Sequence, residues 1–530
     1  LSGIKFITDS DTEVLLNAFI LWGDQCLEKL NGMFSFIVYD SVEGTFFAAR
    51  DQFGIKPLYY VELPDSIIFA SEVKSLLDFL PANEINHSYV RSYLYESALD
   101  FGDECLFKDV KQIKAGHYLS SNDVGQSQWY DIELAVIREI RSGGSDKKYL
   151  EKLNKAVEIR LRSDVDIAYT LSGGMDSSTI FALASRQCDQ SKLQAFTLVD
   201  EKLNSPIQLD MLGAKSVVGM IGGQLKCVPL PNTFSLDSIK ASIYSQDFPS
   251  WSLAHVTYDQ VYATIKADGF KVLLEGHGND EILGGYPTHI LDCAESLLRK
   301  FKFREAWAAC KTYVNTNSSS YTNKKAGAGI VYLAMLIPFL RLVVQRFKIS
   351  KSAYVKLFPS IKPLVFKRRK NSKLTFMQLT LVELVTRTII PTVLRTFDRS
   401  TMLNSIEMRP PFMDPEIVEL SLALGDVARI SNESQKGILR DAMKDFLPND
   451  VVNNSVKSGF TNDIRTVADM FTPQIVEENF SHEINVIGMS KGAYDELFES
   501  YLIDRSWENA NVINKTAALL CWVQVFSVVR

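Results

Sequence analysis

The sequence predicts an α/β protein in which a parallel sheet carries two glycine-rich loops and a β-rich region precedes that sheet. Between about residues 135 and 290, short strand-favouring segments alternate with loops and helical segments, which is the pattern of a parallel sheet covered by helices. Two of these strands are followed directly by glycine-rich turns that open helices. A chain of 530 residues is too long for one core, which also favours two or three domains.

The N-terminal region begins with a predicted helix over residues 11–30, whose apolar side chains recur at helical spacing. Ser10 is a suitable N-cap for this helix, and Glu13 would complete a capping box with it. Strands are predicted next, at residues 33–39 and 44–49, with a hairpin turn between them.

The second region contains four strand candidates, at residues 166–171, 195–199, 225–230 and 271–274. Turn residues and a mixed-charge helix around residues 123–144 separate the two regions, so we place a domain boundary near residue 135. Beyond Tyr286 the pattern is mostly helical, with long periodic segments at residues 382–394, 416–424 and 517–529. We therefore expect a layer of helices beside the sheet.

The segment Leu171 to Ser178, LSGGMDSS, lies between the strand at 166–171 and an apolar helical segment. A helix N-terminus presents unpaired N–H groups and the positive end of the helix dipole, and two glycines let phosphate oxygens approach the backbone. Asp176 would repel a phosphate unless a divalent cation lay between them. The segment therefore predicts a phosphate site with a cation. It is not a Walker loop, because no Lys-Ser or Lys-Thr pair follows the glycines; the alternative is a turn that binds nothing.

A second glycine-rich turn, Glu275 to Tyr286, follows the strand at 271–274 and has the sequence EGHGNDEILGGY. Loops at the carboxyl ends of parallel strands converge on one crevice. Asp176 and Asp280 are therefore predicted to share Mg²⁺ ions that bridge phosphate groups. The alternative for Asp280 and Glu281 is that they are helix N-terminal acids that interact favourably with the dipole.

Composition favours small-molecule substrates and a reducing compartment. A net charge of −6 and a pI of about 5.7 provide no general attraction to nucleic acid. The seven cysteines have no Cys-x-x-Cys spacing, and their odd number argues against a complete disulfide framework. A zinc site is disfavoured because none of the six histidines lies at ligand spacing from a cysteine pair. We therefore expect a cytoplasmic location. The chain begins with Leu1 instead of Met, so we expect a cut, processed or partial N-terminus.

Residues 341–373 contain eleven Lys or Arg and no acidic residue. The apolar run at 326–340 that precedes them is too short to cross a bilayer and is broken by Pro338. One interpretation is a surface helix and a polybasic stretch in weak peripheral contact with an anionic membrane. The other, which we favour, is a buried helix followed by a solvated basic loop.

Several ordered motifs resemble the glutamine-dependent asparagine synthetase family. The first loop is similar to the Ser-Gly-Gly-x-Asp-Ser loop of enzymes that adenylate a carboxylate and release pyrophosphate, and the second is similar to the family's Gly-x-Gly-x-Asp-Glu-x-x-Gly-Gly-Tyr loop. Further matching segments are DRSTM at 398–402, RPPFMD at 409–414, KGILR at 436–440 and KSGF at 457–460. In the N-terminal region they are LNGMF at 30–34, ARDQFGIKPLYY at 49–60 and FASE at 69–72.

The resemblance implies a partial N-terminal-nucleophile glutaminase sandwich at residues 1–135, lacking its N-terminal part. It implies a Rossmann-like adenine nucleotide alpha hydrolase domain, or ATP-pyrophosphatase, with added helices at residues 136–530. The implied activity is ATP-dependent amide formation. A carboxylate, for which aspartate is the first candidate, attacks the α-phosphate of ATP and forms an acyl-adenylate with release of pyrophosphate. Ammonia from glutamine then converts the acyl-adenylate into an amide. Alternatives are a related amidotransferase or β-lactam synthetase-like enzyme with another acceptor acid, or an inactive binding relative. A homo-oligomer is compatible with each of these.

The resemblance also assigns roles to individual positions. ATP and pyrophosphate contacts fall on Thr170, Ser172, Gly173, Gly174, Asp176, Ser177, Leu198, Glu275 and Gly276. Mg²⁺ falls on Asp176 and Asp280, and Lys457 would stabilise charge on the phosphates or on the tetrahedral intermediate. Asp11 matches the aspartate that holds the amino group of glutamine, and it is equally well interpreted as the N-terminal acid of its helix.

Two features depart from the family. The family's nucleophilic cysteine precedes the region where this chain starts, and Cys26 falls within a helical pattern, where we interpret it as a core residue. The chain as it stands is therefore not expected to hydrolyse glutamine. His277 stands where asparagine synthetases carry a glutamate, close to the reacting acyl group. We therefore treat His277 as a candidate catalytic base and leave the acceptor acid open.

Overall fold

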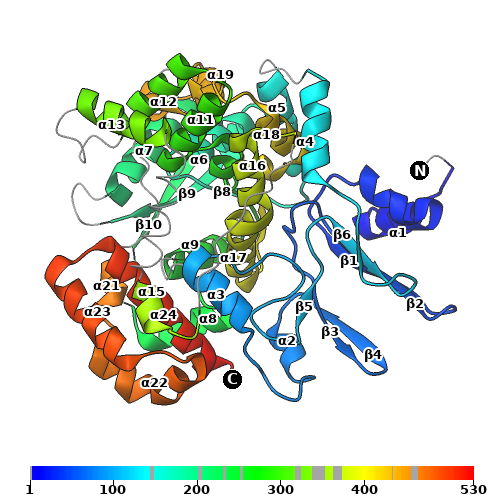
Figure 1. The fold of residues 1–530 in the computed structure, drawn as a ribbon. Helices are drawn as coiled ribbons and strands as arrows, with labels where there is room; N and C mark the ends of the chain where they lie inside the picture. Colours follow the sequence, from blue (N-terminus) through cyan, green and yellow to red (C-terminus); the bar gives the residue numbers. More distant parts are fainter. Residues whose placement is uncertain are drawn as a thin grey trace.

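The computed structural model describes residues 3–143, 148–200, 206–230, 234–250, 255–316, 324–336, 353–361, 373–431, 434–454 and 464–529. The N-terminal strands form a lobe at the right of Figure 1, beside a larger body of helices around a sheet. Lys457 and most of the basic stretch at 341–373 lie outside the described residues.

Antiparallel hairpins build the N-terminal lobe. The elements of this part of the chain are α1 (Asp11–Trp22), a 3-10 turn (Gly23–Lys29), β1 (Ser35–Asp40), β2 (Thr45–Arg50), β3 (Tyr59–Leu63), β4 (Ser66–Ala70), α2 (Lys74–Leu77), α3 (His87–Glu96), β5 (Lys111–Gln112), β6 (His117–Ser120) and β7 (Gln126–Gln128). Of these, α3 packs against the larger body, where the Tyr93 hydroxyl donates to the carbonyl of Lys515. One sheet has the order β1-β2-β6-β7 and the other β4-β3-β5. The two predicted strands are confirmed as β1 and β2. The predicted helix ends early, at Trp22, because Gly23 turns the chain with φ +56°.

The N-terminus of α1 differs in detail from the predicted capping box. Ser10 caps the helix as predicted, by accepting a hydrogen bond from the N–H of Thr12 at 3.2 Å. Glu13 does not bond to Ser10; it accepts from the backbone N–H groups of Ile7 and Thr8, at 2.8 and 2.7 Å. The carboxylate therefore orders the segment before the helix.

A five-stranded parallel sheet with the order β10-β9-β8-β11-β12 lies at the centre of the larger body. Its strands and the helices between them are β8 (Ile167–Thr170), α6 (Met175–Ala184), β9 (Gln194–Val199), α7 (Pro206–Ile221), β10 (Gln224–Pro229), α8 (Leu236–Gln246), α9 (His255–Ala267), β11 (Val272–Leu274) and β12 (Glu407–Arg409). All four predicted strands are confirmed, whereas β12 has only three residues and shows no period in the sequence. The order places β8 and β11, which precede the two glycine-rich loops, side by side.

The remaining helices lie around this sheet, except that the last four of the chain form a separate group that packs on α8 (Figure 1). They are α4 (Ile132–Arg141), α5 (Tyr149–Arg160), α10 (Asn279–Leu283), α11 (Pro287–Arg299), α12 (Phe303–Thr316), α13 (Lys324–Leu336), α15 (Ala353–Leu357), α16 (Phe376–Glu383), α17 (Ile390–Leu403), α18 (Pro415–Ala423), α19 (Gly437–Met443), α20 (Asn449–Asn453), α21 (Ile464–Ala468), α22 (Pro473–Ile487), α23 (Lys491–Asp504) and α24 (Trp507–Val525). The predicted segments at 416–424 and 517–529 fall largely in α18 and α24.

The predicted helix at 382–394 is wrong as a single regular helix. A π-helical turn, Leu384–Thr388, joins α16 to α17 just before Pro391, which has no N–H to continue the hydrogen-bond ladder. The combined run Phe376–Leu403 is long and apolar enough to cross a bilayer. However, 56% of its most apolar 18-residue stretch is buried inside the protein, and α17 forms ion pairs with the N-terminal lobe. We therefore interpret the run as a core element of the fold.

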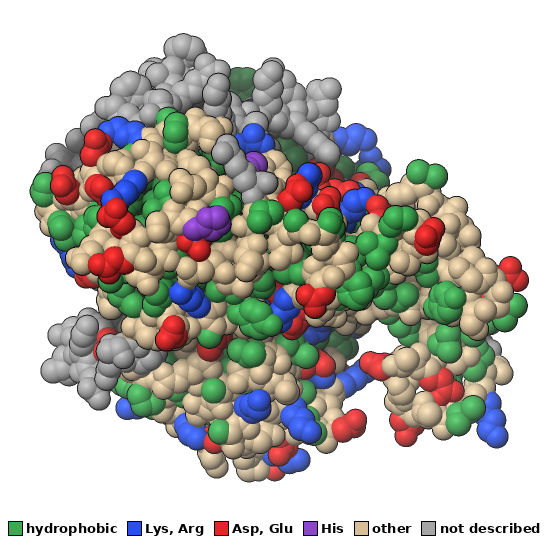
Figure 2. Space-filling model, turned by 90° about the horizontal axis from the view of Figure 1, so that it is seen from below, with side chains coloured by type: hydrophobic (Ala, Val, Ile, Leu, Met, Phe, Trp, Pro, Cys, Tyr) green, Lys and Arg blue, Asp and Glu red, His purple; other side chains and the backbone are tan. Residues whose placement is uncertain are grey.

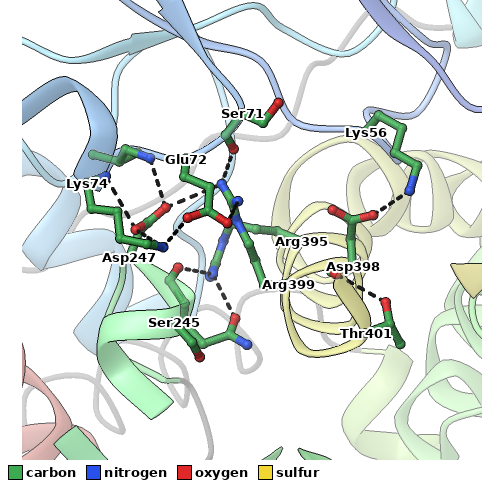
Figure 3. Close-up of polar contacts among 12 residues, drawn as sticks. Lys56, Ser71, Glu72, Lys74, Ser245, Asp247, Arg395, Asp398, Arg399 and Thr401 are labelled. Carbon is green, nitrogen blue, oxygen red and sulfur yellow. Dashed lines mark hydrogen bonds and ion pairs between the residues drawn. The ribbon is translucent and has the colours of Figure 1, made fainter. Parts of the chain in front are cut away.

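Buried ion pairs join α17 and the end of α8 to the N-terminal lobe, as Figure 3 shows. Asp247 is fully buried, and its carboxylate lies 3.1 Å from Lys74 Nζ and 3.3 Å from Arg399 Nη2. Next to it, Lys56 Nζ lies 2.7 Å from Asp398 Oδ1. The DRSTM segment therefore holds the two parts of the molecule together.

We expect Asp247→Ala to lower the free energy of unfolding by about 3 kcal/mol or more, because Arg399 and Lys74 would lose a buried partner. Their other partner, Glu72, has a side chain that is 38% exposed and interacts more weakly. Urea unfolding would measure the change. Lys108→Ala, which removes an exposed pair with Glu84, is the control, and it should cost no more than about 1 kcal/mol. Equal losses in the two variants would contradict the prediction.

Candidate active site

The two glycine-rich loops pack tightly against each other and against α7. Gly173 has φ +68°, and a Cβ at this position would lie only 2.4 Å from the backbone nitrogen of Ala214. A Cβ at Gly276 would lie 2.9 Å from the backbone nitrogen of Ser177. Both glycines are therefore required by the close approach of neighbouring backbones, whatever the site binds.

Hydrogen bonds to the serine hydroxyls stabilise the turn of the first loop. The N–H of Ser172 donates to Ser177 Oγ at 3.1 Å, and the two hydroxyl oxygens are 3.0 Å apart. The N–H of Gly174 donates to Ser172 Oγ at 3.3 Å. Gly174 is also the N-cap of α6 and supplies no side-chain cap, so N–H groups of the first helical turn remain available to an anion.

Asp176 and Asp280 converge on one ammonium group, as the strand order predicts. Lys436 Nζ lies 2.6 Å from Asp176 Oδ2 and 2.6 Å from Asp280 Oδ1. Asn279 Nδ2 donates to Asp176 Oδ1 at 2.5 Å. Burial lowers the pKa of Lys436, but the charges of the two carboxylates outweigh burial and raise that pKa above its ordinary value. Lys436 is therefore a charged amine that offsets the repulsion between the two acids.

A cavity of about 120 Å³ opens beside these carboxylates. It is lined by both loops and by the segment that starts α19, including Lys436 and Arg440. Arg440 Nε donates to the carbonyl of Gln435 at 2.9 Å, and this bond fixes the guanidinium. The cavity thus combines helix N–H groups, two cations and three acids, Asp176, Asp210 and Asp280, which suits a phosphate chain together with a divalent cation.

The pair Asp176 and Asp280 fits a Mg²⁺ ion. Their oxygens contact the same nitrogen and so lie within about 5 Å of each other. Proteins usually hold Mg²⁺ through one or two carboxylates, and phosphate oxygens and water supply the other ligands. Across the described ranges, no group of three or more His, Cys, Asp or Glu residues forms a self-contained metal site. A Mg²⁺ ion here would therefore depend on the phosphate for further ligands.

The positions that the resemblance assigns to adenosine lie at neighbouring strand ends. Thr170 ends β8, Leu198 is the penultimate residue of β9, and Gly276 follows β11. Because β8 lies between β9 and β11, the three residues share one edge of the sheet. Thr170 Oγ1 donates to Glu275 Oε1 at 2.9 Å. Their contact with adenosine stays a prediction.

His277 is held in place beside this edge. Its Nε2 lies 3.1 Å from Glu275 Oε2, and its ring stacks on Phe397 with 3.9 Å between ring centroids. Glu275 is buried and also accepts from the hydroxyl of Tyr262 at 3.2 Å. A neutral imidazole that donates from Nε2 to this carboxylate has Nδ1 as its proton acceptor. Phe397 belongs to α17, the helix that joins the N-terminal lobe.

Other predicted residues lie elsewhere. Helix α1 lies at the outer side of the N-terminal lobe (Figure 1). Asp11 is exposed in the first turn of α1 and accepts a hydrogen bond from Thr12 Oγ1 at 3.4 Å. This agrees with its interpretation as a helix N-terminal acid; its contact with glutamine stays a prediction. Lys457 lies outside the described residues. Asp414 of the RPPFMD segment caps α18 and pairs with Arg160 at 2.8 Å, so that segment supports the structure.

The pattern of the asparagine synthase family matches residues 148–524, and that of a glutamine amidotransferase domain matches residues 1–130. The chain belongs to the asparagine synthase family. Curated relatives include asparagine synthetase 3 of Bacillus subtilis, which is 26% identical over 474 residues, or 85% of this chain and 70% of the relative. Amidase chry2 of Gibberella zeae is 23% identical over 503 residues, or 86% of this chain and 73% of the relative. Putative asparagine synthetase 2 of Methanocaldococcus jannaschii is 30% identical over 310 residues, or 55% of this chain and 57% of the relative.

This asparagine synthase family member is an ATP-dependent amidotransferase, a ligase that forms carbon–nitrogen bonds with glutamine as the nitrogen donor. The family predicted from the ordered motifs is confirmed, and so is the mixed α/β fold with amidotransferase and synthase parts. Sequence reasoning matched the KGILR segment at 436–440 but gave no role to Lys436 or Arg440. Their role in the site could have been suspected from the sequence, because both are basic residues at the start of a short helix in a segment that matched the family.

Proposed function

We propose that the enzyme makes asparagine from aspartate in the cytoplasm, by adenylating the aspartate side chain with ATP and releasing AMP and pyrophosphate. In this proposal residues 136–530 activate the acid and residues 1–135 belong to the part that supplies ammonia. The supporting observation is the convergence of Asp176 and Asp280 on Lys436 beside a cavity lined by both glycine-rich loops. An arrangement of acids, cations and helix N–H groups at the ends of β8 and β11 suits a nucleoside triphosphate.

The groups that line the cavity would have different roles according to their charge. Backbone N–H groups of the first turn of α6 would hold the pyrophosphate, and Lys436 and Arg440 would offset the negative charge that develops as it leaves. When bound by Asp176 and Asp280, Mg²⁺ would supply further charge neutralisation at the phosphates.

The remaining predicted positions complete the proposed site. Thr170, Leu198 and Gly276 would surround the adenosine, and Lys457 would stabilise the charge of the tetrahedral intermediate. Glu275 would hold His277 and Thr170 in position through its carboxylate.

A ligase for another carboxylic acid is the second candidate. The observation that favours it is His277, whose stacked and hydrogen-bonded imidazole stands where asparagine synthetases carry an acid. Pyrophosphate release with ATP, Mg²⁺, ammonium and a panel of acids tests both candidates, because ammonium removes the need for glutamine. Release with aspartate supports the first candidate and release with another acid supports the second. No release with any acid would overturn both.

His277→Gln separates a catalytic base from a residue that only shapes the pocket. If His277 accepts a proton during amide formation, we expect kcat to fall by about a hundredfold or more with little change in KM for ATP. If it only contacts the acid, KM for the acid should rise and kcat should hold. Steady-state kinetics on both substrates give the answer. His482→Gln, an exposed histidine on α22, is the control and should leave both constants unchanged.

A further inference from the structure

Four apolar side chains are exposed together on α12, on α13 and on the loop before α12. The exposed fractions of Phe301, Phe303, Trp307 and Leu333 are 79%, 49%, 41% and 61%. The rings of Phe301 and Phe303 are 6.3 Å apart between centroids, and Trp307 packs edge-on against Tyr332 at 5.4 Å. The Tyr332 hydroxyl donates to the carbonyl of Phe303 at 3.5 Å. We call the surface of Phe301, Phe303, Trp307 and Leu333 the aromatic patch, and the contacts above link its three aromatic residues through Tyr332.

Basic residues alternate with the aromatic ones. The loop reads Lys300-Phe301-Lys302-Phe303-Arg304, and Lys302 and Arg304 are exposed. Lys300 anchors the loop through a 2.8 Å ion pair with the buried Asp426. After Glu305 the sequence has no acidic residue until position 383. The patch therefore combines exposed aromatic rings with the charges of Lys302 and Arg304 against one exposed acid, Glu305, and exposed aromatic rings beside basic side chains are the chemistry that recognises an anionic lipid surface.

The backbone at Phe301 supports a role for its ring outside the protein. Phe301 follows the end of α11 with φ +59°, in the left-handed region that favours glycine or asparagine. The turn is closed by a hydrogen bond of 2.9 Å from the N–H of Lys302 to the carbonyl of Leu297. Folding alone would favour glycine here, because a bulky side chain strains this conformation and the ring buries little surface.

The patch belongs to elements at the periphery of the fold. Helices α12 and α13 lie at an outer corner of the molecule, away from the N-terminal lobe and from α22 to α24 (Figure 1). On the face seen from below in Figure 2, acidic and basic side chains are interspersed.

We propose that the aromatic patch docks the protein on an anionic lipid bilayer, with the rings of Phe301, Phe303 and Trp307 at the level of the headgroups. Lys302 and Arg304 would lie against the lipid phosphates. The contact is peripheral, because it involves side chains of a loop and two helices and no membrane-spanning segment. It does not depend on the identity of the acceptor acid.

Co-sedimentation with vesicles tests the proposal. We expect the protein to bind vesicles of phosphatidylcholine mixed with phosphatidylglycerol, to bind phosphatidylcholine alone weakly, and to lose binding as salt rises. The double variant K302E/R304E should bind the anionic vesicles roughly tenfold more weakly or worse. The control K266E/K271E makes the same change of charge at exposed lysines near the end of α9 and the start of β11, and should bind within about twofold of the unmodified protein.

Phe301→Gly separates docking from folding. We expect it to weaken vesicle binding severalfold because the ring is lost, while the melting temperature holds or rises because the strained backbone is relieved. Three results would overturn the proposal: no binding to anionic vesicles, unchanged binding by Phe301→Gly, or equal loss in K266E/K271E. Self-association through the patch in the absence of lipid, seen by analytical ultracentrifugation, would instead assign the surface to a second copy of the chain.

Discussion

Asp280→Ala is expected to reduce pyrophosphate release by about a thousandfold or more, the largest effect that the structure predicts for one side chain. The substitution removes one of the two carboxylates that converge on Lys436, and with it one of the two proposed ligands of Mg²⁺. The cavity would then keep the positive charges of Lys436 and Arg440 but would lose one of its three acids, which are Asp176, Asp210 and Asp280. The assay is release of pyrophosphate with saturating ATP, Mg²⁺ and ammonium in the presence of the acid that the panel identifies.

The cause of that loss can be tested directly. Asp280→Asn keeps the shape of the side chain but not its charge, so we expect it to lose activity to a similar degree if charge is what matters. Asp268→Ala is the control, because Asp268 is an acid that pairs with Lys226 outside the site. Retention of more than about a tenth of the activity by Asp280→Ala would overturn the metal assignment.

The meeting of the two loops was predictable because it follows from short-range patterns and one rule of topology. A strand, a glycine-rich turn and a helix start lie within about a dozen residues in each case, and parallel neighbours expose their loops at the same edge. The structure confirms this outcome through the adjacency of β8 and β11 and the convergence of Asp176 and Asp280.

What the sequence did not predict depends on contacts with no local pattern. Lys436 reaches Asp176 across 260 residues of sequence, from a left-handed residue that starts a short helix. Phe397 stacks on His277 from α17, whose sequence shows only helical spacing. Glu13 bonds backwards to residues 7 and 8 because those N–H groups come within its reach, which a capping pattern does not encode.

Lys436→Met is expected to change both activity and the response to Mg²⁺. In the unmodified protein the pKa of Lys436 is raised above its ordinary value of 10.5. The amine is therefore charged at every pH below 10.5, and its ion pairs are lost only when the pH rises through the raised pKa. Without the amine, Asp176 and Asp280 face each other in a partly buried site. Their repulsion should therefore destabilise the folded variant relative to the unmodified protein.

Magnesium should compensate for the missing charge. We expect Lys436→Met to unfold more easily than the unmodified protein by about 3 kcal/mol without metal, and to gain more in melting temperature when Mg²⁺ is added, because the cation binds the folded pair of carboxylates. Lys436→Arg keeps the positive charge and should respond to Mg²⁺ much as the unmodified protein does. Thermal unfolding with and without Mg²⁺ measures this without any activity assay. Equal Mg²⁺ shifts in Lys436→Met and the unmodified protein would show that Asp176 and Asp280 do not bind the ion together, and the two acids would then act in this site only as partners of the lysine.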